Sequence, residues 1–108
     1  MYYAQGFVGK TVTLRTITGE EMWRLPLNDG HFVRIESKIA DVINGGISAA
    51  GASIGAAFIG TFVAPEQIWA HLDIAGSDYT EEASATTPAG FTGWGVRILD
   101  EYIRRHHE

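Results

Sequence analysis

Two side chains in the second half of the chain have the types and spacing for acid–base or metal chemistry. His71 and Asp73 stand two residues apart in the apolar run Ile68–Ala75, so a β-strand there would place both on one face. Such a pair could bind a metal ion, or act as a general base and the group that orients it. No third ligand stands nearby in the sequence. The alternative is a buried polar pair that neighbouring loops satisfy.

Three other patterns match functional motifs only loosely. Residues 4–11 end in Gly-Lys-Thr, as a phosphate-binding loop does, but almost nothing precedes them and a strand pattern follows. Residues 93–95 (Gly-Trp-Gly) open a helix without the third glycine of a dinucleotide fingerprint, and we interpret them as close packing of a helix N-terminus. His106 and His107 could bind stray metal at the end of the chain. No His-Glu-x-x-His occurs, and no Ser-His-Asp order is convincing, so the residues alone indicate no catalytic site.

The composition excludes several classes of protein. The chain has 108 residues, enough for one domain, and its 45% apolar and 19% charged content is typical of a globular protein. A net charge of -5 argues against a nucleic-acid partner, because phosphates are neutralised by clustered Lys and Arg. The absence of cysteine excludes disulfides, thiolate nucleophiles and cysteine metal sites. The first residues do not have the pattern of a signal peptide.

One uncharged segment raises the question of a membrane span. Residues 47–64 carry no charge, and Gly51 and Gly55 have the spacing of a membrane dimerisation motif. The segment is rich in Gly, Ala, Ser and Thr and poor in Leu and Val, so its insertion into a bilayer would be marginal. A helix buried on all sides in a folded domain accounts for the same residues. We therefore expect no membrane partner.

Apolar residues recur at helical spacing in three segments. A helix is expected at 31–43, with Asp29 as its N-cap and an apolar face made by Phe32, Ile35, Ile39 and Val42. A second helix, rich in small residues, is expected at about 48–63 and is ended by Pro65. The third begins at about residue 93 and has a buried stripe of Trp94, Ile98, Leu99, Tyr102 and Ile103.

Alternating or continuous apolar runs predict three strands, at 11–18, 22–27 and 68–75. Residues 77–90 are polar and acidic and contain Pro88, which indicates a surface loop. Helices that alternate with strands are typical of a layered α/β domain. The predicted fold is therefore α/β: a partial layered domain in which a short mixed sheet of about three strands packs with about three helices.

Five stretches occur in the order in which one enzyme family has them. The most specific is W-A-H-L-D-I-A-G, and the others are G-E before W-R-L-P-L, S-K-I-A-D-V, N-G-G before G-A-S-I-G-A-A-F, and T-G-W-G-V-R-I-L. Together they resemble the C-terminal part of the catalytic domain of the leucyl aminopeptidases, or cytosol aminopeptidases. The resemblance covers about residues 19–103, and residues 1–108 are expected to form a single domain of this kind. Residues 11–18 depart from it, because the family usually has a helix there.

The resemblance implies a dinuclear metallopeptidase that releases N-terminal amino acids from peptides. Members of the family place two divalent metals, zinc or manganese, on a lysine, three aspartates and a glutamate, several of them within an N-T-D-A-E-G-R motif. That motif is absent here, and Lys10 and Lys38 do not stand in the family's lysine context. We therefore expect no metal, no catalytic residue and no activity in this chain by itself. The family also implies a cytoplasmic homo-oligomer.

One substrate-binding element of the family has counterparts in this chain. The turn after H-L-D-I-A-G helps to line the family's pocket for the N-terminal side chain of the substrate. The matching positions are Ala75 and Asp78. Ala75 would form a wall of the pocket. Asp78 replaces the apolar residue often found there and would favour a polar or basic side chain on a peptide N-terminus.

Two other interpretations stay open. A strand at 11–18 could replace sheet neighbours that lie elsewhere in the family's domain, which would make the chain a non-enzymatic small assembly or interaction protein. An uncovered sheet and the apolar helix at 48–63 would then favour self-association. Alternatively, the chain could complement a separate metal-bearing polypeptide.

Overall fold

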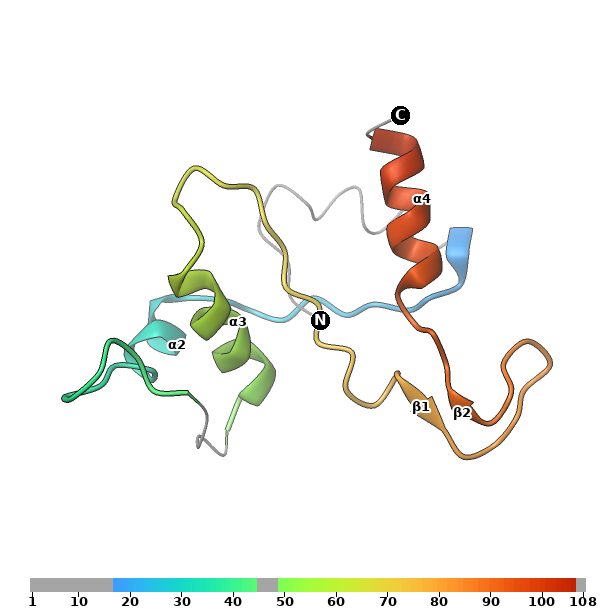
Figure 1. The fold of residues 1–108 in the computed structure, drawn as a ribbon, viewed down its shortest axis with the longest axis horizontal. Helices are drawn as coiled ribbons and strands as arrows, with labels where there is room; N and C mark the ends of the chain where they lie inside the picture. The colour runs from blue at the N-terminus through green and yellow to red at the C-terminus, as the bar shows by residue number, and fades with distance from the viewer. Residues whose placement is uncertain (1–16, 45–48, 107–108) are drawn as a thin grey trace. The chain divides into compact units, whose positions relative to one another are not determined.

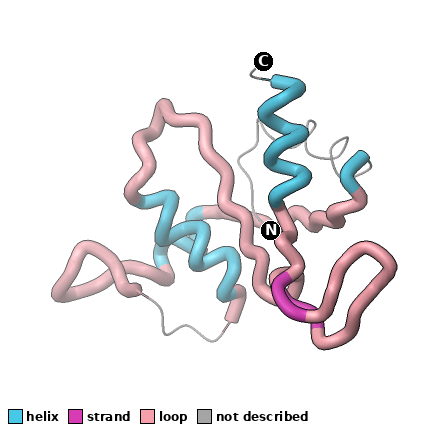
Figure 2. Tube along the Cα trace, turned by 45° about the vertical axis from the view of Figure 1, so that its right-hand side comes forward, coloured by secondary structure: helices cyan, strands magenta, loops and turns pink. Residues whose placement is uncertain are grey.

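A computed structural model describes residues 17–44 and 49–106, which form two compact units (Figure 1). The first unit includes residues 23–44 and 49–73, with helices α2 (Asp29–Val33) and α3 (Gly51–Thr61). The second includes residues 17–22 and 74–106, with strands β1 (Tyr79–Thr80) and β2 (Gly90–Phe91) and helix α4 (Val96–His106). These elements have α/β character, although loops make up most of the described chain (Figure 2).

Helix α3 is the centre of the first unit. Its small residues allow neighbouring segments to approach closely, and Ser53, Ile54, Ala56 and Ala57 are buried on it. The Ser53 hydroxyl donates a hydrogen bond of 3.0 Å to the carbonyl of Pro26, which attaches the helix to the preceding segment. The helix lies within the range that the sequence predicts and stops before Pro65.

The apolar core of the first unit lies between α3 and the segment that contains α2. Ile35, Ile54 and Ala57 form its buried centre, and four partly buried side chains pack against them: Leu27, Phe32, Val42 and Phe58. Ile35 is only 2% exposed. Small and branched side chains therefore pack together where α3 meets the segment around α2.

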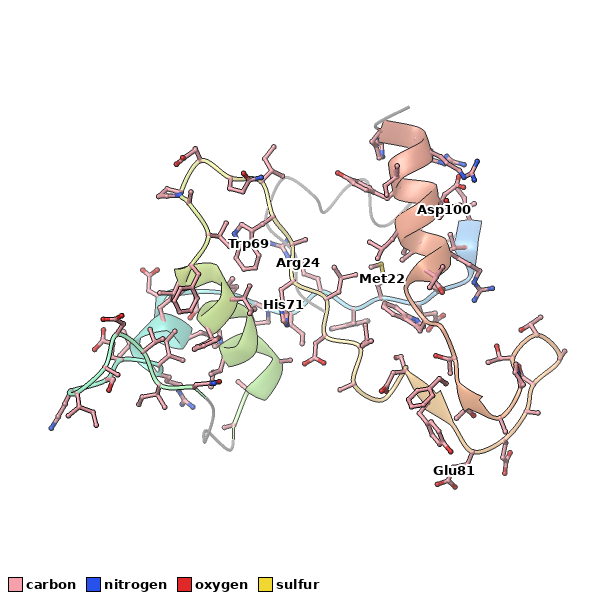
Figure 3. All side chains as sticks on the ribbon, in the orientation of Figure 1. Met22, Arg24, Trp69, His71, Glu81 and Asp100 are labelled. Atoms are coloured by element: carbon pink, nitrogen blue, oxygen red, sulfur yellow. The ribbon has the colours of Figure 1, made fainter. Side chains whose placement is uncertain are left out.

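Gly60 makes the closest approach in this unit. A Cβ atom added to it would lie 2.8 Å from Cζ2 of Trp69 and 3.6 Å from Cζ of Phe32. A real Cβ is essentially never found at the first of these distances. The indole of Trp69 thus packs directly on the backbone of α3, as its place beside the helix in Figure 3 illustrates.

We expect Gly60→Ala to lower the free energy of unfolding by about 1–2 kcal/mol, because overpacking outweighs the gain in helix propensity. Gly55→Ala is the matched control in the same helix. Its added Cβ would lie 4.0 Å from Nε2 of His71, an ordinary contact. That variant should gain up to about 1 kcal/mol. Urea unfolding followed by tryptophan fluorescence compares the two, and equal effects would contradict the close packing.

The prediction of a helix at 31–43 is wrong beyond Val33. Helix α2 ends there, and the chain continues as a turn and a loop closed by a bridge between Glu36 and Val42. The hydroxyl of Ser37 accepts hydrogen bonds from the amides of Ile39 and Ala40, at 3.2 and 3.1 Å. Hydrogen bonds from a serine hydroxyl to nearby amides compete with those of a helix. The β-branched residues of this segment also have a low helix propensity.

The start of α2 also differs by one residue from the expectation. Asn28, with extended backbone, is the N-cap, and Asp29 is the first helical residue. The amide of Asn28 donates to Nδ1 of His31 at 3.1 Å. An acidic residue in the first turn suits the helix dipole, so Asp29 still supports the N-terminus.

The second unit contains the hairpin β1–β2 and helix α4. The strands are antiparallel, with Tyr79 opposite Phe91, whose rings meet edge to face at 5.5 Å. This hairpin lies where the sequence predicts only a loop. The final helix is confirmed, although it begins at Val96 and not at about residue 93. Of its expected stripe, Ile98 is buried, but Leu99 and Ile103 are 46% and 53% exposed.

The expected strands are not found in the described part of the chain. Residues 22–27 and 68–75 have no regular secondary structure, and Ile17 and Thr18 have helical backbone. The rest of the strand expected at 11–18 lies outside the described residues. A strand requires a hydrogen-bonded neighbour as well as an apolar pattern. In the described residues, β1 and β2 form the sheet, so two strands replace the expected three.

No helix in the described residues is long and apolar enough to cross a membrane. The segment that raised this question contains α3, which is 11 residues long.

Candidate functional site

His71 and Asp73 both lie in the first unit and are partly buried. Figure 3 shows His71 on the extended chain that passes α3, and Nε2 of its ring lies near Gly55. Burial lowers the pKa of His71 below its ordinary 6.5, while the negative charge of Asp73 acts in the opposite direction. The charge of Asp73 thus acts on the imidazole of His71.

The lowered pKa of His71 predicts a pH-dependent stability. The unfolded chain binds a proton at this residue below about pH 6.5, whereas the folded chain resists it, so stability is lost as the pH falls through that region. We expect wild type to lose more stability than His71→Asn between neutral and acidic pH. Asp73→Asn should increase the loss, because the charge that raises the pKa is removed. Urea unfolding at several pH values measures these slopes, and identical slopes would contradict the prediction.

The described residues do not assemble a metal site around His71. In residues 17–44 and 49–106, no group of three or more His, Asp or Glu side chains could hold a metal ion. His106 packs its ring against Tyr102, with centroids 5.1 Å apart, and His107 lies outside the described residues. The phosphate-loop pattern at residues 4–11 also lies outside them.

The predicted substrate-binding positions lie on a turn of the second unit. Ala75 is exposed and Asp78 is partly buried. The amide of Ser77 donates to the carbonyl of Ile74 at 2.9 Å, and Gly76 adopts a φ of 82°. This left-handed conformation favours glycine, which explains why a glycine stands in the turn after the apolar run.

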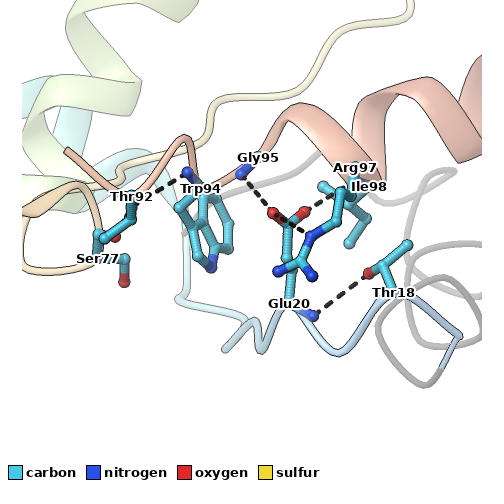
Figure 4. A network of polar contacts seen from close by, with 8 residues as sticks. All are labelled: Thr18, Glu20, Ser77, Thr92, Trp94, Gly95, Arg97 and Ile98. Carbon is cyan, nitrogen blue, oxygen red and sulfur yellow. Dashed lines mark hydrogen bonds and ion pairs between the residues drawn. The ribbon is translucent and has the colours of Figure 1, made fainter. Parts of the chain in front are cut away.

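Thr92 fastens this turn to the segment that leads into α4. Its hydroxyl donates to the carbonyl of Ser77 at 2.6 Å, and its amide donates to the carbonyl of Asp78 at 2.9 Å. The same hydroxyl accepts a bond of 3.2 Å from the amide of Trp94 (Figure 4). Two hydrogen bonds from Thr92 therefore hold the backbone at Ser77 and Asp78.

Glu20 is a buried carboxylate of the second unit, and the sequence placed it in the G-E pair of the family resemblance without assigning it a role. It is 2% exposed. Its carboxylate accepts hydrogen bonds from the amides of Gly95, at 3.1 Å, and Ile98, at 2.8 Å, and from Nε of Arg97 at 3.4 Å (Figure 4). These amides belong to the start of α4, where a negative charge is favourable. A residue more than 70 positions away thus caps the helix.

The glycines before α4 are required by backbone conformation. Gly93 and Gly95 have φ values of 65° and 98°, and no atom of the described residues lies within 4 Å of a Cβ added to either. In the described residues, positive φ accounts for these glycines, in place of the close packing that the sequence suggested. Positive φ lets the chain turn so that the amide of Gly95 points at Glu20.

Comparisons with known proteins agree on one family. A sequence model of the cytosol aminopeptidase family, catalytic domain, matches residues 3–100. The chain is 44% identical to a probable cytosol aminopeptidase of Dinoroseobacter shibae over 93% of its length, and 48% identical to one of a Geobacter species over 82%. These alignments cover 20% and 18% of the two relatives.

Two solved structures have a fold similar to that of this chain. A mutant of tomato leucine aminopeptidase superposes with a TM-score of 0.84 and 31% identity, and covers 97% of the chain. The bottromycin maturation enzyme BotP in complex with Mn superposes with a TM-score of 0.88 and 33% identity, and covers 99% of the chain. The chain matches 20% and 24% of these two proteins. It therefore spans about a fifth of the relatives that it resembles.

Proposed function

Because the chain belongs to the cytosol aminopeptidase family, we propose that it is the C-terminal segment of a metallopeptidase catalytic domain that releases N-terminal amino acids from peptides. The observation that carries this proposal is the match over nearly the whole chain to about a fifth of each relative. In this proposal the segment acts in the cytoplasm, and the rest of such a domain supplies the reaction centre.

The metal chemistry of the family does not fit the described residues. Two-metal hydrolysis needs carboxylates that hold two ions about 3.5–4 Å apart. The described part of the chain holds no cluster of His, Asp and Glu suited to even one ion, and the sequence contains no N-T-D-A-E-G-R motif. We propose that the chain has no aminopeptidase activity by itself.

Our proposed role for this chain is to form part of the substrate pocket. Ala75 is exposed, and Thr92 holds the backbone next to Asp78, so this turn presents a defined surface. A carboxylate at Asp78 would favour peptides whose N-terminal side chain is polar or basic, since opposite charges attract more strongly where water is partly excluded.

The purified chain is expected not to hydrolyse aminoacyl amides when zinc or manganese is added. Mixing it with the preceding four-fifths of the Dinoroseobacter relative should restore turnover. In that mixture, Asp78→Asn should lower kcat/KM for an N-terminal lysine more than for leucine. Robust turnover by the chain alone would contradict its proposed dependence on the rest of the domain. Equal effects on both substrates would contradict the role of Asp78.

A second candidate function is a non-enzymatic assembly module, and the exposed apolar side chains favour it. Ile39, Phe91 and Ile68 are 98%, 82% and 79% exposed. Exposed apolar surface is typical of regions that contact another protein. A module of this kind would self-associate and would not restore turnover in the mixture, so the same experiment separates the two functions.

A further inference from the structure

Thr92 lies where the pairing of the hairpin strands gives way to the segment before α4. The antiparallel register of β1 and β2, continued by one position, places Thr92 opposite Asp78. The amide of Thr92 donates to the carbonyl of Asp78 at 2.9 Å, so the backbone pairing extends this far. The next residue, Gly93, has a φ of 65° and leaves the extended conformation. The contact of Thr92 with Ser77 is made by its side chain instead.

The hydroxyl of Thr92 donates and accepts at the same time. It donates to the carbonyl of Ser77 at 2.6 Å and accepts from the amide of Trp94 at 3.2 Å (Figure 4). The amide of Gly95, next in the chain, donates to the buried carboxylate of Glu20. The segment before α4 is therefore anchored, and the hydroxyl connects the turn to it.

The turn that this hydroxyl holds is exposed. Residues 74–77 are all exposed, and the amide of Ser77 donates to the carbonyl of Ile74 at 2.9 Å, which closes the turn. Exposed turns are among the more mobile parts of a protein, because their hydrogen bonds are open to water. Thr92 supplies further bonds at the carbonyls of Ser77 and Asp78. These bonds restrict the position of the turn relative to α4.

We propose that Thr92 is a positioning residue for recognition of the substrate's N-terminal side chain. Its hydroxyl holds the turn so that Ala75 and Asp78 present one fixed surface to that side chain. This inference rests on the proposed function, in which these two positions line the pocket. Thr92 acts through the turn and not by contact with the substrate. A pocket wall that is already ordered loses less conformational entropy on binding, so the hydroxyl contributes to affinity.

Removal of the hydroxyl alone tests this role. Thr92→Val keeps the branched shape of the side chain and is assayed in the mixture with the preceding four-fifths of the Dinoroseobacter relative. It should raise KM for lysine amide about fivefold with little change in kcat, because the turn contributes to binding and not to the chemical step. KM for alanine amide, whose side chain is a single methyl group, should change much less. A variant that merely failed to fold would lower the turnover of both substrates and leave KM unchanged.

Thr80→Val is the matched control. The hydroxyl of Thr80 also donates to a carbonyl and accepts from an amide, both of Glu82, at 2.9 and 3.3 Å. It holds the loop beyond β1 and not the turn, so this variant should leave KM unchanged. Thr92→Ser and Thr92→Ala form a second pair, which differs by the hydroxyl alone. Serine should retain the wild-type KM, and alanine should raise it as valine does.

Hydrogen exchange in the chain alone, followed by NMR, tests the hold on the turn directly. In Thr92→Val the amide of Ser77 should exchange about fivefold faster, because the turn opens more often, whereas Thr80→Val should leave its rate unchanged. An unchanged rate in Thr92→Val overturns the role of Thr92, whatever the mixture shows.

The kinetic outcomes separate this inference from the function on which it rests. A wild-type mixture without turnover contradicts the proposed function and, with it, the role of Thr92. If the wild-type mixture is active, the role of Thr92 alone is overturned when Thr92→Val leaves KM unchanged or raises it equally for lysine and alanine amides. It is also overturned if Thr92→Ala and Thr92→Ser give the same KM.

Discussion

Replacing Glu20 with alanine is expected to lower the free energy of unfolding by about 3–5 kcal/mol, because two buried amides lose their acceptor. These are the amides of Gly95 and Ile98, both in buried residues at the start of α4. The whole stability of a domain is about 5–15 kcal/mol, so the loss is a large part of it. Urea unfolding followed by circular dichroism measures the change.

Two further variants separate the contributions at this site. Glu20→Gln keeps one acceptor oxygen and should cost less, about 1–3 kcal/mol. Arg97→Gln removes only the cation, whose side chain is 63% exposed, and should cost at most about 1 kcal/mol. If Arg97→Gln were as damaging as Glu20→Ala, the ion pair and not the helix cap would be the principal contribution.

The second large effect is expected at Ile35. Ile35→Ala should lower the free energy of unfolding by about 2–5 kcal/mol, since it leaves a cavity where a fully buried side chain stood. Ile54 and Ala57 line the space that it would vacate. Chemical denaturation followed by tryptophan fluorescence measures the change, because Trp69 packs on α3, the helix against which Ile35 also packs.

Ile39→Ala is the matched control for Ile35→Ala. It makes the same change four residues later, at a side chain that is 98% exposed, and should alter stability by no more than about 0.5 kcal/mol. Low protein concentration keeps self-association out of the measurement. In the helix that the sequence predicts at 31–43, the two residues would share one face and both changes would be costly. Similar costs would therefore favour that helix over the observed loop.

Helices α3 and α4 could be predicted because their signals are local. Helix α3 is an uncharged run rich in small residues and is followed by Pro65, and α4 repeats apolar residues at helical spacing. The segment after α2 had the same spacing, yet Ser37 bonds to nearby amides and the chain turns instead. Periodicity could not distinguish these outcomes, because it reports which residues are apolar and not which backbone bonds form.

The residues of the candidate site also differ in how much the sequence could reveal about them. Ala75 and Asp78 could be named from the resemblance, and their role in binding stays a prediction. Glu20 stands in the G-E pair of the same resemblance, but its role could not be predicted, because a cap donated from a distant segment has no local sequence signal. Nor could the hairpin of residues 79–91 be predicted, because its strands are two residues each and depend on pairing across a long loop.

The sequence by itself determined the family of this protein and the positions of α3 and α4, through motifs and side-chain patterns that act over a few residues. Only the tertiary structure decided that Ile35 is buried and Ile39 exposed, that β1 pairs with β2, and that Glu20 caps α4. The physical reason is that burial, strand pairing and helix capping by a distant carboxylate depend on segments far apart in the chain. Their free energies arise only when folding brings those segments together.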